Sequence, residues 1–107
     1  MDIQIFNKIK AAVALYIPKD AIALLYGSQA RNDETSESDW DILVILNKSK
    51  LQPSDFDNIT YPLTKLGWEI DTEINPIMYT KEEWEKSKIT PFYQNVQRDA
   101  ILLNEPK

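Results

Sequence analysis

The stretch that decides the fold reads Ile22-Ala23-Leu24-Leu25-Tyr26-Gly27-Ser28 and resumes, after a polar segment, as Asp39-Trp40-Asp41-Ile42-Leu43-Val44-Ile45-Leu46. Both apolar runs are short and rich in branched or aromatic residues, which is typical of buried β-strands. Side chains alternate along a strand, so both carboxylates of the second run share one face and Trp40 takes the other. Antiparallel pairing of the two strands would bring Gly27 and Ser28 beside Asp39 and Asp41. We therefore expect a site at that end of the sheet.

The residue types at this expected site indicate phosphate chemistry. Two neighbouring carboxylates repel each other, and a cation relieves the repulsion. Sites built from oxygen atoms suit Mg²⁺, which keeps several waters and binds one or two carboxylates together with substrate phosphates. A glycine next to a small hydroxyl residue lets the backbone approach a ligand, and free amides at a turn bind phosphate. The pattern predicts metal-assisted phosphoryl or nucleotidyl transfer.

The same residues carry a resemblance to a known family. Gly-Ser followed by a spacer and Asp-apolar-Asp-apolar resembles the signature of the nucleotidyltransferase superfamily that includes DNA polymerase beta. The segments Gly27-Ser28-Gln29-Ala30-Arg31 and Ser38-Asp39-Trp40-Asp41 are similar to the minimal nucleotidyltransferases, which are often paired with a HEPN-domain protein. Asn32 stands where that family usually has glycine, and asparagine also tolerates a positive φ. The resemblance implies an α/β fold with a small mixed β-sheet and helices mainly on one face.

The resemblance also implies roles for five residues. Asp39 and Asp41 would bind two Mg²⁺ ions that bridge the triphosphate of ATP. Gly27 and Ser28 would hold the phosphates. Arg31 would either reach those phosphates as a fork-shaped donor or pair with the acidic residues near it in the sequence.

A third carboxylate is expected from a strand beside Asp39 and Asp41. We expect a strand over 68–79, and alternation along it puts Asp71 and Glu73 on one face. The resemblance favours Asp71, in Ile70-Asp71-Thr72, as the third metal ligand and catalytic carboxylate. Glu73 has the same parity and stays an alternative, as does an acidic solvent-facing surface with no ligand.

The rest of the chain indicates a helical frame around these strands. We expect helices over 2–17, 53–66 and 80–88, and another that begins at Thr90-Pro91. Pro62 predicts a kink or break near Tyr61, and Gly67 a helix end. Residues 28–38 are polar and predict a solvated loop with one helical turn after Ser28. Trp84, Phe92 and Tyr93 are expected to pack in the core rather than to stack on bases.

Composition narrows the classes of function. A chain of 107 residues predicts a single domain over 1–107. The sequence has no cysteine and no histidine, which leaves carboxylates to bind metal or move protons. A net charge of −5 disfavours binding to bulk nucleic acid. No apolar run reaches the length of a membrane span and the N-terminus lacks a signal-peptide core, so we expect no membrane contact and a cytoplasmic location.

The function implied by the resemblance is transfer of AMP from ATP to a hydroxyl group of an acceptor. The small size of the chain favours a partner protein as the acceptor, and the resemblance points to a HEPN-domain toxin with this chain as the antitoxin. Two alternatives stay open. The chain could be a catalytically decayed module that neutralises its partner by binding, or a modifier of a small molecule such as an antibiotic, although such enzymes usually carry an added helical domain. An oligomer is compatible with each of these functions.

Overall fold

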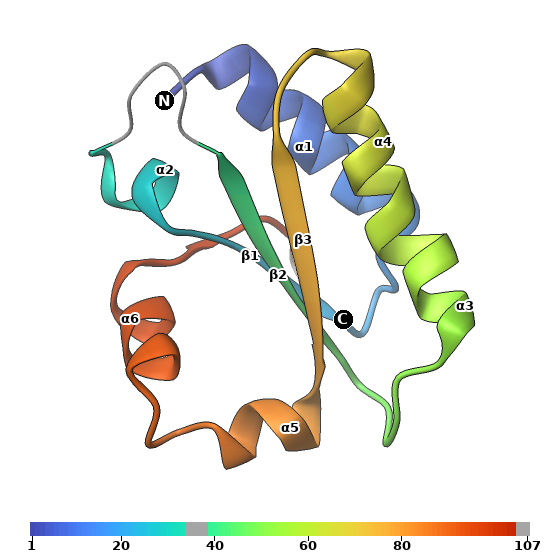
Figure 1. Ribbon diagram of the computed structural model, residues 1–107, viewed down its shortest axis with the longest axis vertical. Helices are drawn as coiled ribbons and strands as arrows, with labels where there is room; N and C mark the ends of the chain where they lie inside the picture. Colours follow the sequence, from blue (N-terminus) through green and yellow to red (C-terminus); the bar gives the residue numbers. More distant parts are fainter. Residues whose placement is uncertain (34–38, 105–107) are drawn as a thin grey trace.

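Four strands form one mixed sheet in the computed structural model, which describes residues 1–33 and 39–104 (Figure 1). The strands are β1 (Ile22–Tyr26), β2 (Trp40–Leu46), β3 (Ile74–Thr80) and β4 (Ile101–Leu102). Their order in the sheet is β3-β2-β1-β4. β1 pairs antiparallel with β2 and with β4, whereas β2 and β3 run parallel. The expected mixed α/β sheet is confirmed.

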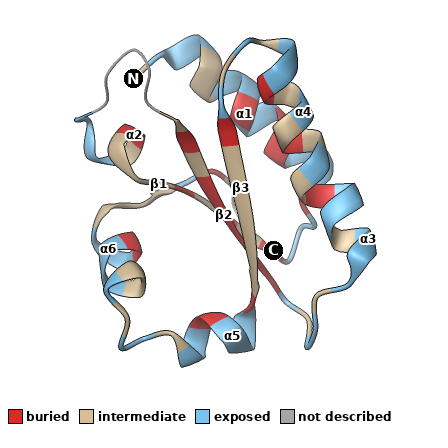
Figure 2. Cartoon of the chain, in the orientation of Figure 1, coloured by how far each residue is buried: buried red, intermediate tan, exposed pale blue. Residues whose placement is uncertain are grey.

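The longest helix and the continuous helical segment that follows β2 lie on one face of the sheet. α1 (Ile3–Tyr16) and α4 (Tyr61–Glu69) pack there on a core that includes Ile42 and Val44. Because side chains alternate along β2, Leu43 and Ile45 point to the opposite face, which the short helices α5 (Lys81–Lys86) and α6 (Pro91–Asp99) cover. Figure 2 shows the burial along β2 that results from cover on both faces.

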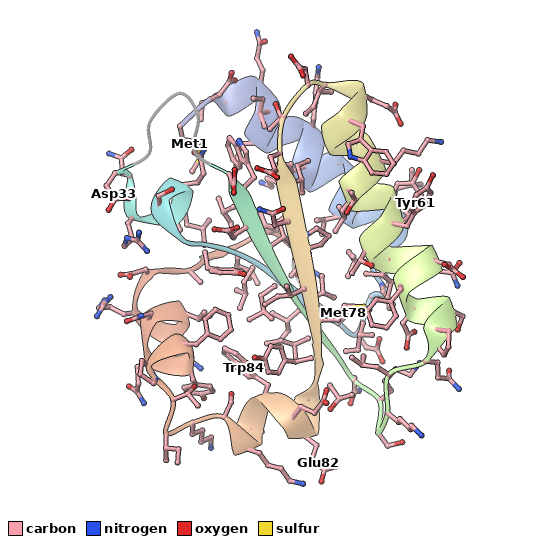
Figure 3. The ribbon with its side chains drawn as sticks, in the orientation of Figure 1. Met1, Asp33, Tyr61, Met78, Glu82 and Trp84 are labelled. Carbon is pink, nitrogen blue, oxygen red and sulfur yellow. The ribbon has the colours of Figure 1, made fainter. Side chains whose placement is uncertain are left out.

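Aromatic side chains fill the layer beneath α5 and α6. The ring centroids of Trp84 and Tyr93 are 4.7 Å apart, and those of Tyr26 and Phe92 are 5.2 Å apart with the rings edge to face. Trp84 lies between α6 and the sheet (Figure 3) and is 5 % exposed. The expectation that Trp84, Phe92 and Tyr93 pack in the core is confirmed.

Several helix ends follow from local chemistry. The Asp2 carboxylate accepts hydrogen bonds from the N–H groups of Gln4 and Ile5 and so caps α1, which ends before Pro18. Thr80 and Glu83 form a reciprocal capping box at the start of α5, the helix expected over 80–88. A single helical turn, α2 (Ser28–Arg31), follows β1 as expected. The remaining loop residues of that segment, 34–38, lie outside the described residues.

The helical segment after β2 is longer than expected, and Gly67 does not end it. The segment comprises α3 (Pro53–Asp55), the π-helical stretch η1 (Phe56–Thr60) and α4, which continues to Glu69. Pro62 lacks an amide donor, and the chain accommodates it with a wide turn instead of a break. A Cβ on Gly67 would lie 2.5 Å from the carbonyl oxygen of Thr72. Gly67 therefore permits close passage of the following loop rather than a helix stop.

The expected strand over 68–79 begins too early. Trp68 and Glu69 belong to α4, and β3 begins only at Ile74. Asp71 lies in the intervening turn with a positive φ of 54°. The alternation of apolar and acidic residues before Ile74 therefore does not mark a strand. These residues form the end of α4, the loop that passes close to Gly67 and the turn at Asp71.

A search of the described residues for a helix able to cross a membrane finds none.

Candidate active site

Asp41 lies directly against the backbone of Gly27. The β1–β2 register puts Tyr26 opposite Asp41, so the next residue, Gly27, leaves β1 beside the carboxylate. A Cβ built on Gly27 would lie 2.5 Å from Asp41 Oδ2. The backbone of Gly27 has φ 79° and ψ −159°, a conformation that is essentially restricted to glycine. The expected meeting of the Gly-Ser corner with the Asp-x-Asp strand is therefore confirmed for these two residues.

Asn75, near the start of β3, and Glu73, just before it, lie beside Asp39 and Asp41. Asn75 is the parallel-strand neighbour of Asp41, and its Nδ2 donates a hydrogen bond of 3.1 Å to Asp39 Oδ2. Glu73 precedes β3, and its carbonyl oxygen accepts a hydrogen bond of 2.9 Å from the N–H of Trp40. A hydrogen bond with Asp39 raises the pKa of the Glu73 carboxyl, and the negative charges of Asp39 and Asp41 add to that effect.

The electrostatics of this end of the sheet favour neutral side chains or a bound cation. Burial raises the pKa of Asp41, and the charge of Asp39 raises it further, against a hydrogen bond from Asn75 and the charge of Arg31. Burial and then the charge of Asp41 raise the pKa of Tyr26 to about 12. Tyr26 is therefore a neutral phenol at physiological pH.

The donor set fits Mg²⁺. Asp41 on β2 and Asp39 just before it supply carboxylate oxygens, which match the preference of this ion for oxygen ligands. Among the described residues, no three acidic side chains are grouped closely enough to hold a metal by themselves. A pair of carboxylates leaves coordination positions for water and substrate phosphates, as is usual for Mg²⁺ in phosphate-transferring sites.

The corner that contains Gly27 and Ser28 adjoins a cavity of about 210 Å³. Tyr26, Gly27 and Arg31 line it from the β1–α2 side. Arg31 Nε donates to Asp33 Oδ2 at 3.2 Å in an exposed ion pair, and its charge also lowers the pKa of Asp41. Both expected roles of Arg31 thus stay open. Asn32 adopts the left-handed conformation with φ 60°, as its tolerance of positive φ predicts.

Asp71 and Glu73 differ in their position relative to Asp39 and Asp41. No hydrogen bond or ion pair joins Asp71 to Asp39 or Asp41 in the described part of the chain, whereas Asp39 lies close enough to Glu73 to raise the pKa of the Glu73 carboxyl. Asp71 and Glu73 both line a second cavity, of about 450 Å³, at the start of β3. Asp71 was expected on the strand, and its position in the turn follows from the later start of β3.

Sequence reasoning missed the roles of Asn75 and Tyr26. The signal for Tyr26 was available, because antiparallel pairing of the two apolar runs already places it opposite Asp41. Asn75 has the same parity as Glu73 in the sequence, but its hydrogen bond to Asp39 depends on the parallel register of β3, which no local pattern specifies.

Comparisons with known proteins agree with this geometry. The family described as “Polymerase beta, Nucleotidyltransferase” matches residues 7–104. A protein of Methanocaldococcus jannaschii named “Putative protein adenylyltransferase MJ0604” is 35% identical over 80 residues, which cover 75% of this chain and 74% of that protein.

Two solved structures share the fold. One is a crystal structure of a toxin-antitoxin with AMP-PNP, with a TM-score of 0.65 and 22% identity over 95% of this chain and 74% of the other. The second is the tri-AMPylated HEPN toxin of Shewanella oneidensis in complex with MNT antitoxin, with a TM-score of 0.60 and 22% identity over 97% of this chain and 72% of the other.

Proposed function

Because this chain belongs to the polymerase beta type of nucleotidyltransferases, we propose that it transfers AMP from ATP to a hydroxyl group of a partner protein. The observation that carries the proposal is the close approach of the Gly27 backbone to the Asp41 carboxylate of β2, with Asp39 just before the start of that strand. AMP and a protein acceptor are suggested by the name of the archaeal relative. A HEPN-domain toxin is the proposed partner because a structural neighbour is an antitoxin bound to such a toxin.

Asp39 and Asp41 would hold Mg²⁺, which supplies positive charge to the triphosphate and to the leaving pyrophosphate. Gly27 lets the backbone pass close to the Asp41 carboxylate, whose Oδ2 takes the space that a Cβ would need. Ser28 and Arg31 would donate hydrogen bonds to the phosphate oxygens. Asn75 orients Asp39 through its hydrogen bond to Oδ2.

The acceptor oxygen attacks the α-phosphorus, a new P–O bond forms, and the bond to pyrophosphate breaks. The hydroxyl proton must leave, and a chain without histidine has carboxylates for that task. The family resemblance favours Asp71 for this role, whereas the position beside Asp39 favours Glu73. We assign the third carboxylate to Glu73 as part of the proposal.

The test is to incubate the protein with ATP, Mg²⁺ and a candidate HEPN-domain partner, and to follow the mass of that partner. The partner should gain the mass of AMP. Asp41→Asn should abolish the gain, and Glu73→Gln should lower its rate by about 100-fold or more while ATP affinity changes little. Asp71→Asn should lower the rate less than Glu73→Gln does, and Glu82→Gln, at an exposed carboxylate of α5, is the matched control that should keep the wild-type rate.

Other outcomes decide between the alternatives. A larger loss in Asp71→Asn than in Glu73→Gln would restore Asp71 as the third carboxylate. If the partner binds tightly and loses its own activity without any gain in mass, this chain is instead a binding module. The amide of Asn75 opposite Asp41, where a further carboxylate could stand, is the observation that favours this second function.

A further inference from the structure

A cavity of about 450 Å³ lies between the end of α4 and the start of β3. Trp68 and Asp71 line it from the helix end and the turn, and Glu73 and Asn75 line it from the strand side. Asn75 also donates to Asp39, so the cavity adjoins the carboxylate pair. A ligand in this cavity would therefore lie next to the reacting atoms.

The cavity and the Gly27 corner lie on opposite sides of the carboxylate pair. The sheet order β3-β2-β1 places Asp39 and Asp41, on and just before β2, between Asn75 on β3 and Gly27 after β1. In nucleotidyl transfer the attacking and leaving oxygens are roughly in line across the phosphorus. If the Gly27 corner holds the leaving pyrophosphate, the acceptor approaches from the β3 side, where the cavity lies.

Trp68 gives this cavity an exposed aromatic wall. Its side chain is 68 % exposed, whereas Trp40 and Trp84 are buried. The Trp68 and Tyr61 rings meet edge to face with centroids 6.1 Å apart, and Figure 3 shows Tyr61 on the outer side of the helical segment. Two exposed aromatic side chains on one helix, in contact with each other, form a surface suited to a partner.

The charge of the lining selects the kind of partner. Asp71 and Glu73 contribute carboxylates, and no lysine or arginine is among the described residues that line the cavity. An indole ring attracts a cation placed over its face, and carboxylates bind a guanidinium or ammonium group by charge-assisted hydrogen bonds. The net charge of −5 on the chain acts in the same direction.

We propose that this cavity binds an arginine or lysine side chain of the acceptor polypeptide and thereby selects hydroxyl groups that have a basic neighbour. This inference rests on the proposed nucleotidyl transfer, since it places the acceptor on the β3 side. Trp68 acts as a specificity-determining residue that touches the acceptor chain but not the reacting atoms. Asp71 belongs to the same cation site.

The test uses two serine-containing peptides that differ only in an arginine or a citrulline two residues from the serine. Citrulline preserves the shape of arginine without its charge. Binding is followed by NMR on the indole N–H signal of Trp68, which the Trp68→Phe variant identifies. The arginine peptide should shift this signal and the citrulline peptide should not. Trp68→Ala should raise the Kd of the arginine peptide, measured on a backbone amide near Thr72, by about 3- to 30-fold.

Two controls keep the result specific. Ile89→Ala removes an apolar side chain that is 93 % exposed and distant in sequence from the cavity, and should leave peptide binding unchanged. Trp68→Ala should also bind ATP as tightly as the wild type. Equal binding of the two peptides, or a Kd that Trp68→Ala does not change, would overturn the inference.

Failure of the inference and failure of the proposed function give different results. AMP transfer to the partner together with indifference to the peptide charge would refute only the cation site. Discrimination of arginine by Trp68 without transfer to any acceptor would refute the enzymatic proposal and leave the cavity as a cation-binding site.

Discussion

Replacing Gly27 with alanine tests whether the backbone at the end of β1 has to be a glycine. The conformation at φ 79° and ψ −159° costs a residue with a Cβ about 1–3 kcal/mol. The new Cβ would also lie 2.5 Å from Asp41 Oδ2, which real Cβ atoms avoid, so the carboxylate has to move. We therefore expect Gly27→Ala to destabilise the fold by more than the backbone term alone.

A double-mutant cycle with Asp41→Ala separates the two effects. Asp41→Ala removes the carboxylate but keeps Asp41 Cβ, which is 3.6 Å from the Cβ built on Gly27 and thus at ordinary contact distance. In the Asp41→Ala background, Gly27→Ala should cost only the backbone term of about 1–3 kcal/mol. In the wild type it should cost a further amount of about 0.5–3 kcal/mol, the range of coupling between residues in contact.

Urea unfolding of the four proteins in metal-free buffer measures the cycle. Thermal unfolding gives a second readout. With an unfolding entropy of about 2.1 cal/mol/K per residue, a loss of about 1–3 kcal/mol in the free energy of unfolding lowers the Tm of a chain of this length by about 4–13 °C. Equal costs of Gly27→Ala in the two backgrounds would show that the Cβ does not meet the carboxylate. If Gly27→Ala costs less than about 0.5 kcal/mol in both the wild-type and the Asp41→Ala background, the backbone at Gly27 is not strained either.

Three further predictions concern the same end of the sheet. Asp41→Asn should stabilise the metal-free protein at neutral pH, because the raised pKa of Asp41 means that the folded state disfavours the ionised carboxylate; the gain should vanish in urea titrations below the ordinary pKa of aspartate, where both folded and unfolded wild type are protonated. The Tyr26 phenol should titrate at about 12 in NMR spectra of ring-labelled tyrosine, and Asp41→Asn should lower that value because the charge of Asp41 contributes to it; an unchanged value would contradict the contribution. Asp71→Val should lower the free energy of unfolding by about 1–2 kcal/mol because a β-branched residue resists φ 54°, whereas Asp71→Asn should change it little; equal stabilities would argue against the left-handed turn.

The sequence by itself determined the central hairpin and its chemistry. The apolar runs that became β1 and β2 identify themselves by length and residue type, and their antiparallel pairing is the simplest arrangement for consecutive strands. Capping residues such as Thr80 and Glu83 act within one turn, so their effect is local and can be predicted. For this reason the helix starts and the Gly27–Asp41 corner were expected correctly.

Only the tertiary structure decided which residues surround that corner from β3. The alternation of apolar and acidic residues over 68–75 predicts a strand, but packing of α4 against the loop at Gly67 extends the helix to Glu69. The parallel register of β3 is set by contacts across the sheet rather than by any local pattern, and it brings Asn75 rather than Asp71 opposite Asp41. Local chemistry thus fixed the residues that ends and turns require, whereas long-range packing fixed the partners of the carboxylates.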